Sequence, residues 1–283
     1  MSTFLNEFDD ADKGEIRPET SSLMHPCCYL RRKIIPRIVK NKTKEEIVWT
    51  YLVARKYENN HRELSRILCS RYQDIPDKSR IWIEAHLQPT RQNEGDCWET
   101  CADLSMGRLD RIENTKMQVQ AGGDWVCICE SKWHRDIDEY PDGTNQLCKI
   151  IEHALLLHNK DGSFHNRVYV TLITPKSFKY PTHKFFQRKY QDTFRAYLED
   201  KNSLEEDLRK CHLEFLDYKM KKTVKERISA LELNWVTFEE LLQLPNLVEK
   251  CIPGKYRVTI DTWEEIFALL SMAGVVTELK GCL

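Results

Sequence analysis

Hydrophobic and polar positions divide the chain into a helical start, a central region of short apolar runs, and a helical end. Apolar residues recur every three or four positions from about 43 to 57 and from 61 to 72, which predicts two helices. Thr43 and Glu46 stand at the spacing of a capping box and mark the start of the first helix. A shorter helix is expected over about 79 to 87.

From Cys97 to Thr174 the apolar runs shorten and turn residues separate them, which predicts strands. Gly107 and the pair Gly122 and Gly123 are expected to mark the first two turns. The apolar spacing also predicts a helix and then a fully apolar strand, which suits a buried crossover position beside the preceding strand. The expected elements are strands at about 97 to 105, 108 to 114 and 124 to 133, a helix from 144 to 158, and a strand from 167 to 174.

Beyond Thr174 the pattern predicts amphipathic helices, with capping-box spacing at Thr237 and Thr262. Their expected ranges are about 182 to 200, 203 to 217, 221 to 231, 237 to 243 and 260 to 273. The chain is thus expected to be an α/β protein with a mixed sheet. Its expected parts are an N-terminal arm over 1–42, a core over 43–175 and a helical C-terminal extension over 176–283.

Composition supports a globular protein without a membrane partner. The 283 residues are 41% hydrophobic and 31% charged, and no apolar run approaches the roughly 20 residues that cross a bilayer. The acidic N-terminus lacks the basic start and apolar centre of a signal peptide. A cytoplasmic location follows as the expectation, with the 11 scattered cysteines as thiols.

The net charge of −1 gives no overall signature of a nucleic-acid binder, but basic residues gather locally. Solvated helix faces would account for each basic segment taken alone. The second interleaves lysine and arginine with aromatic residues and is the best candidate for contacts to phosphates. The three segments lie at about 31 to 44, 176 to 190 and 219 to 227.

The candidate chemistry centres on Glu130-Ser131-Lys132, at the end of the third expected strand. Side chains on a strand alternate faces, so Glu130 and Lys132 project to one side and Ser131 to the other. Asp110 stands on the preceding expected strand. Two carboxylates and an ammonium suit a site for a hard cation and its bound water.

The element order helix, strand, strand, strand, helix, strand, with Asp110 on the second strand and Glu130-x-Lys132 on the third, resembles the PD-(D/E)XK nuclease superfamily. The resemblance implies a restriction-endonuclease-like αβββαβ core. It implies that Asp110, Glu130 and the Ser131 carbonyl bind Mg²⁺ or Mn²⁺ and that Lys132 positions the attacking water. Leu109 stands where the motif often has proline.

Gln146, early in the following helix, resembles a glutamine that some superfamily members place there to contact metal-bound water or substrate, although Ile150 replaces an aromatic residue common in those members. The superfamily often adds an acid before or on the sheet. Glu46 is the first choice here, and Glu63, Glu84, Glu99 and Asp103 are alternatives.

The sequence therefore predicts a metal-dependent nuclease that acts on nucleic acid, with DNA favoured over RNA, and the C-terminal helices are compatible with a homodimer. The alternative is a catalytically silent member that binds nucleic acid or protein. In a third reading Glu130 and Lys132 merely form an ion pair, since Glu278-Leu279-Lys280 repeats the triplet without a strand or a partner acid. His134 is an alternative general base.

Overall fold

The structure, a computed structural model, describes part of the chain, and the first predicted basic segment lies outside that part. The described residues are 46–57, 59–69, 80–87, 100–111, 118–132, 145–159, 161–182, 184–210, 218–243, 249–252 and 255–258.

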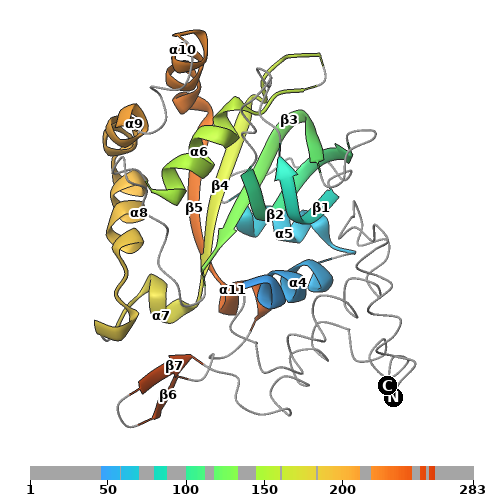
Figure 1. Cartoon of the computed structure of the whole chain (residues 1–283). Helices are drawn as coiled ribbons and strands as arrows, with labels where there is room; N and C mark the ends of the chain where they lie inside the picture. The colour runs from blue at the N-terminus through green and yellow to red at the C-terminus, as the bar shows by residue number, and fades with distance from the viewer. Residues whose placement is uncertain are drawn as a thin grey trace, which may run out of the picture.

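Five of the described strands form one mixed sheet in the order β1-β2-β3-β4-β5 (Figure 1). The first three strands form an antiparallel meander, and β3, β4 and β5 run parallel to one another. A separate antiparallel pair joins β6 to β7. The strands are β1 (Arg80–Leu87), β2 (Thr100–Arg111), β3 (Gln118–Ser131), β4 (Arg167–Thr174), β5 (Leu231–Thr237), β6 (Glu249–Ile252) and β7 (Lys255–Val258).

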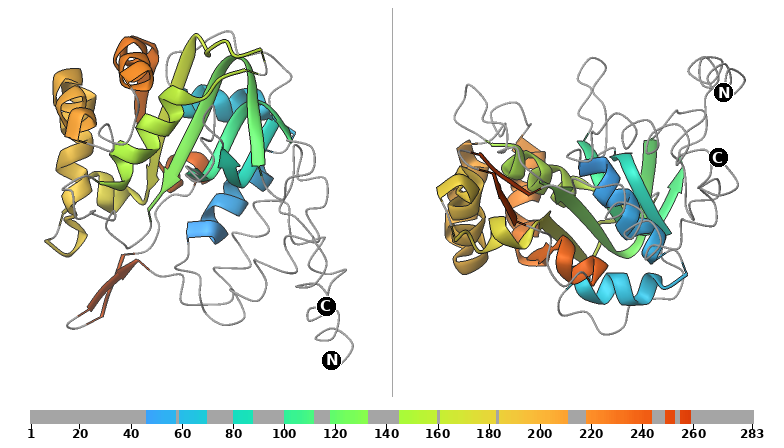
Figure 2. Two further views of the ribbon diagram at one scale, coloured as in Figure 1. Left: turned by 45° about the horizontal axis from the view of Figure 1, so that its top comes forward. Right: turned by 90° about the horizontal axis from the view of Figure 1, so that it is seen from below.

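Helices cover both faces of the five-stranded sheet, and each face has its own hydrophobic core. One core joins the sheet to α4, α5, α7, η2 and α11, and the other joins it to α6, α8, α9 and α10. Figure 2 shows α6 and α11 on opposite sides of the sheet. The helices are α4 (Glu46–Lys56), α5 (His61–Leu68), α6 (Gln146–Leu156), α7 (Lys176–Lys179), η2 (Lys184–Phe186), α8 (Lys189–Glu199), α9 (Lys201–Lys210), α10 (Tyr218–Arg227), η3 (Ile228–Ala230) and α11 (Phe238–Leu242).

Several predicted elements are confirmed. The two N-terminal helices, the helix before β4 and β4 itself lie where the periodicity placed them. Helices α8, α9, α10 and α11 correspond to four of the amphipathic stretches, and Thr237 forms the predicted capping box with Glu240. Thr43 and the helix expected at 260 to 273 lie outside the described residues.

The prediction of a helix over 79 to 87 was wrong, because these residues form β1. Ile81 and Ile83 pack in the core on the α4 side of the sheet, whereas Trp82 packs in the core on the α6 side. This alternation is the period of a strand that is covered on both faces.

The predicted domain boundary at residue 175 would separate strands that belong to the same sheet. Strand β5 runs parallel to β4, and the paired residues extend from Val168 with Leu231 to Thr174 with Thr237. The core therefore continues well past residue 175. In Leu231–Thr237 the residues Leu231 and Trp235 pack on the α6 side and Val236 packs on the α4 side. The C-terminal part is therefore not a purely helical extension. None of the described helices has the length and apolar character needed to span a membrane.

Residues expected to form two strands around a turn at Gly107 form the single strand β2. The register against β3 shifts at this point, since Gly107 faces Val126 and Arg108 faces Gly122. Gly107 has a φ of 142°, and a Cβ added there would lie 3.1 Å from the carbonyl oxygen of Trp125. The glycine therefore marks a β-bulge and not a turn.

We expect Gly107→Ala to lower the free energy of unfolding by about 1 to 3 kcal/mol, because alanine is strained at positive φ and its Cβ presses on the backbone of β3. Urea denaturation measures the effect. Gly162→Ala is the matched control, since Gly162 also has a positive φ of 83° but has nothing within 4 Å of an added Cβ. Equal losses in the two variants would contradict the role of the close approach.

Candidate functional site

The candidate site lies at the end of β3, where successive side chains face opposite layers. Val126 and Ile128 pack on the α6 side, while Cys127 and Cys129 pack on the α4 side. Continued alternation directs Glu130 toward α6 and Ser131 toward α4. The hydrogen bonds agree, because Glu130 contacts α6 and Ser131 contacts Thr50 of α4.

Glu130 and Lys132 form a close ion pair. The Lys132 Nζ lies 2.6 Å from Glu130 Oε1, and the two side chains are only 12% and 4% exposed, respectively. Burial alone would lower the pKa of Lys132, but the charge and hydrogen bond of Glu130 outweigh it and the pKa is raised. Lys132 is therefore an ammonium group near neutral pH. Its backbone N–H donates to Ile173 O over 2.9 Å, which fixes the end of β3 against β4.

Gln146 stands at the first position of α6 and reaches back to the sheet. Its Nε2 donates to Glu130 Oε1 over 2.8 Å. The start of the helix is fixed by Asn145, whose Oδ1 accepts from the backbone N–H of Cys148 over 3.0 Å. The structure thus brings together three of the predicted site residues, namely Glu130, Lys132 and Gln146.

Asp103 on β2 supplies a second carboxylate beside Glu130. The register that pairs Leu104 with Cys129 continues to place Asp103 opposite Glu130, and Asp103 Oδ2 accepts from the Ser131 N–H over 2.6 Å. Burial, followed by the charge of Glu130, raises the pKa of the Asp103 carboxyl well above its usual range. The two acids are therefore close enough to oppose each other's ionisation.

Helix α4 brings a third acid near these residues. The charge of Glu46, in the first turn of α4, contributes to raising the pKa of both Asp103 and Lys132. One turn later Thr50 Oγ1 lies 3.2 Å from Ser131 Oγ and 2.9 Å from the carbonyl oxygen of Glu46. Glu46, the first choice for the additional acid, thus lies within electrostatic reach of the site.

The other candidates for that acid differ in their positions relative to the site. Glu63 accepts a hydrogen bond from Asn60 at the start of α5, where it serves a local cap. Glu84 lies on β1, and the register that pairs Ile83 with Leu104 and Ala85 with Ala102 places its backbone opposite Asp103, in line with Glu130 across the sheet. Glu99 and His134 lie outside the described residues.

Asp110, the predicted partner of Glu130, is not brought to this end of the sheet. Its backbone pairs with Gln120, and it stands seven residues along β2 from Asp103, the position opposite Glu130, which spans roughly 23 Å of extended strand. The prediction that Asp110 and Glu130 bind the same metal ion is therefore wrong for Asp110. Asp103, named only as an alternative for the additional acid, takes the place opposite Glu130.

The sequence contained a signal for this position. When Gly107 is interpreted as a bulge, residues 100–111 become one strand, and the next strand begins at Gln118. An antiparallel partner of Glu130 then lies near the start of β2 and not near its end. Asp103 is the acid at that position.

The arrangement suits oxygen-ligand chemistry. Asp103 and Glu130 offer carboxylate oxygens, Lys132 an ammonium group and Gln146 a side-chain amide. Hard divalent cations favour such oxygens, and a cation between the two acids would offset their repulsion. Across the described ranges, however, no three histidine, cysteine, aspartate and glutamate side chains lie close enough to hold a metal ion. A cation here would depend on two carboxylates together with backbone carbonyl and water oxygens.

The fold and site define an α/β protein with a mixed five-stranded sheet in its described part, and with a buried acid, lysine and amide cluster at one end of that sheet. Comparisons of the chain with protein-family models, curated proteins and solved structures found no match.

Proposed function

We propose that this protein is a metal-dependent nuclease that hydrolyses phosphodiester bonds, with DNA as the preferred substrate. The observation that carries the proposal is the convergence of Asp103, Glu130, Lys132 and Gln146 from three separate elements at one end of the sheet. Asp103 takes the role that the sequence pattern gave to Asp110.

The order of elements also supports the proposal. Helix α4 precedes the meander β1-β2-β3, and α6 then connects β3 to the parallel strand β4. This is the order of elements on which the resemblance to the PD-(D/E)XK superfamily rests, with an aspartate on the second strand, here Asp103, and the Glu-x-Lys triplet at the end of the third.

Each side chain has a definable role in such a reaction. Asp103, Glu130 and the Ser131 carbonyl would hold Mg²⁺ or Mn²⁺, which supplies charge neutralisation and a more acidic bound water. The Lys132 ammonium has three donors, so it can keep Glu130 in place and also donate to the attacking water or to a phosphate oxygen. Gln146 orients Glu130 by holding Oε1.

One observation favours a second function, a catalytically silent module that binds nucleic acid or protein. Glu130 Oε1 is already held by both Lys132 and Gln146, as it would be in a purely structural buried ion pair. The silent module predicts substrate binding without any turnover. It also predicts that divalent cations do not change the protein's stability.

We expect the purified protein to cleave DNA with Mg²⁺ or Mn²⁺ and to lose this activity in EDTA. Lys132→Ala should lower the cleavage rate about 10² to 10³-fold, because it removes a charge beside the developing transition state. A plasmid-nicking assay and a single-strand digestion assay measure both effects. The matched control is Lys222→Ala, which removes an exposed lysine of α10.

Thermal melts of each variant separate catalytic loss from unfolding, since Lys132→Ala leaves a buried carboxylate without its cation. The proposal is wrong if the folded wild-type protein with either metal leaves duplex DNA, single-stranded DNA and RNA intact. Unchanged cleavage by Lys132→Ala would also contradict it. Mn²⁺ titration of the wild type against Glu130→Gln adds a measurement that does not depend on turnover.

A further inference from the structure

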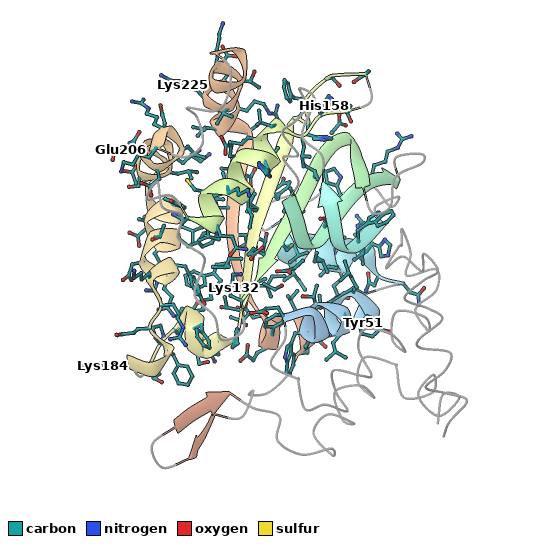
Figure 3. The ribbon with its side chains drawn as sticks, in the orientation of Figure 1. Tyr51, Lys132, His158, Lys184, Glu206 and Lys225 are labelled. Carbon is teal, nitrogen blue, oxygen red and sulfur yellow. The ribbon has the colours of Figure 1, made fainter. Side chains whose placement is uncertain are left out.

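The chain leaves the candidate site directly into a short basic segment. The backbone N–H of Lys132 donates to Ile173 O near the end of β4, and α7 begins three residues later at Lys176. Figure 3 shows Lys132 at the end of the sheet from which this segment departs, with Lys184 farther out on the same side. Lys225 lies at the opposite end of the molecule. The segment is thus positioned to meet a polymer that enters the site.

Residues 176–195 carry a strong excess of positive charge. They contain six lysine and arginine residues and one acid, Asp192. Lys179 lies 3.9 Å from Glu240 of α11 and Arg195 lies 3.4 Å from Asp192, so part of this charge is compensated. The segment also carries Lys184, Arg188, Lys189 and Lys176, and the charge of Lys176 acts on Glu239 of α11.

The basic residues of α10 differ in this respect. Lys222 pairs with Glu226 at 3.6 Å, and Lys225 lies 3.9 Å from Glu205 of α9. Arg227 donates to the carbonyl oxygens of Leu155 and His165 over 2.7 and 2.8 Å. Lys222, Lys225 and Arg227 of α10 therefore form local ion pairs and structural contacts far from the site, whereas the basic segment after β4 begins beside the site.

An exposed aromatic ring accompanies this surplus. Tyr180, directly after α7, is 57% exposed, which is the largest exposed fraction among the large hydrophobic side chains in the described part of the chain. The Lys179 Nζ lies 5.5 Å from the centroid of its ring. Such a ring can stack on a base while the exposed lysines of the same segment, Lys176 and Lys184, meet the adjoining phosphates.

The backbone that presents Tyr180 is held firmly. Phe178 and Phe186 are buried and pack edge to face with ring centroids 5.5 Å apart. Lys179 Nζ donates to Trp235 O of β5, and Arg195 Nη2 donates to Lys179 O over 2.7 Å. The surface is therefore preorganised, which lowers the entropy lost on binding.

We infer that residues 176–182 and 184–189 bind unpaired nucleotides next to the cleavage site, so that the substrate is single-stranded DNA or a duplex end with a single-stranded overhang. The cations contact phosphates and the Tyr180 ring stacks on a base. A fully paired duplex hides the faces of its bases, so the ring selects against it. As a statement about the substrate, this inference rests on the proposed nuclease function, but the binding it describes does not require cleavage.

The test is fluorescence anisotropy with a labelled single-stranded oligonucleotide and the matching blunt duplex, in EDTA so that nothing is cleaved. The single strand is expected to bind more tightly. Tyr180→Ala should weaken single-strand binding about 10-fold, in line with the loss of one stacked base, and Tyr180→Phe should bind as the wild type does.

Charge variants provide the matched comparison. Lys176→Gln with Lys184→Gln should weaken binding and reduce the slope of log K against log salt by about 1.4, since each phosphate contact on a single strand contributes about 0.7. Lys222→Gln with Lys225→Gln removes two lysines from α10 and should change neither quantity.

Three results would overturn the inference: equal affinity for single strand and duplex, wild-type binding by Tyr180→Ala, or equal weakening by the two double variants. Single-strand binding that responds to Tyr180 without any cleavage under Mg²⁺ would support the surface and contradict the proposed function. Metal-dependent cleavage, combined with single-strand binding that Tyr180→Ala does not weaken, would support the proposed function and contradict the binding surface.

Discussion

Replacement of Asp103 by asparagine is expected to reduce DNA cleavage by about 10³-fold or more. Asp103 accepts from the Ser131 N–H over 2.6 Å and stands opposite Glu130, so it is the second carboxylate of the proposed metal site. Asparagine keeps the shape and can still accept that hydrogen bond, but it loses the negative charge that a divalent cation requires. Initial rates at saturating Mn²⁺ and a Mn²⁺ titration measure the loss.

Asp110→Asn is the matched control, because it makes the same chemical change on the same strand. Its backbone pairs with Gln120, far from Glu130 along β3, so cleavage should stay within about twofold of the wild type. The reverse result, with activity lost in Asp110→Asn and kept in Asp103→Asn, would show that the register of β2 against β3 does not define the site. Urea denaturation of both variants checks that neither effect is unfolding.

Much of the site could be predicted from local sequence. The apolar run before Glu130 identified the strand, and alternation placed Glu130 and Lys132 on one face. The helical spacing after Asn145 placed Gln146 at the start of α6, where it does contact Glu130. These inferences depend on residues close in sequence, for which periodicity is a direct physical signal.

The choice between Asp103 and Asp110 depended on a longer-range feature. Gly107 was interpreted as a turn, which splits β2 into two strands and places Asp110 next to Glu130 in the meander. Both turns and bulges favour glycine at positive φ, so the residue type alone does not distinguish them. The close approach of Gly107 to Trp125 O, which does distinguish them, arises only once β2 and β3 are paired.

Two of the missed strands, β1 and β5, have the same kind of explanation. Strand β1 carries apolar residues on both faces, such as Ile81 and Trp82, so a count of apolar positions matches a helix as well as a strand. Strand β5 lies between two short helices and pairs with β4 across more than fifty residues of intervening chain. Tertiary pairing thus decides elements whose local pattern is ambiguous.

A second large effect is expected from Glu152, on the same helix that presents Gln146. Its side chain is fully buried, and within the described residues neither carboxylate oxygen has a hydrogen-bond partner. Burial raises the pKa of Glu152 to about 7 from 4.5, and the nearby charge of Lys149 offsets this only in part. The folded chain therefore holds a proton at pH values where the unfolded chain has released it.

The sign of the pH effect follows from proton binding. Between about pH 4.5 and 7 the folded state binds more protons at this position than the unfolded state does, so the free energy of unfolding falls as pH rises. Above about pH 7 the loss of unfolding free energy caused by Glu152 is complete and amounts to about 3 kcal/mol. An unionised side chain of the same shape would remove this loss.

Glu152→Gln should therefore exceed the wild type in unfolding free energy by less than about 1 kcal/mol at pH 5 and by about 3 kcal/mol at pH 8. Urea denaturation at both pH values measures the difference, in which titrations common to both proteins cancel. Glu206→Gln, at an exposed position of α9, is the matched control and should leave the pH profile unchanged. A Glu152→Gln profile that parallels the wild type would mean that Glu152 has the same pKa in the folded and unfolded states, and it would contradict the prediction. Because α6 positions Gln146 against Glu130, loosening of this helix at high pH would also lower cleavage, and Glu152→Gln should retain activity there.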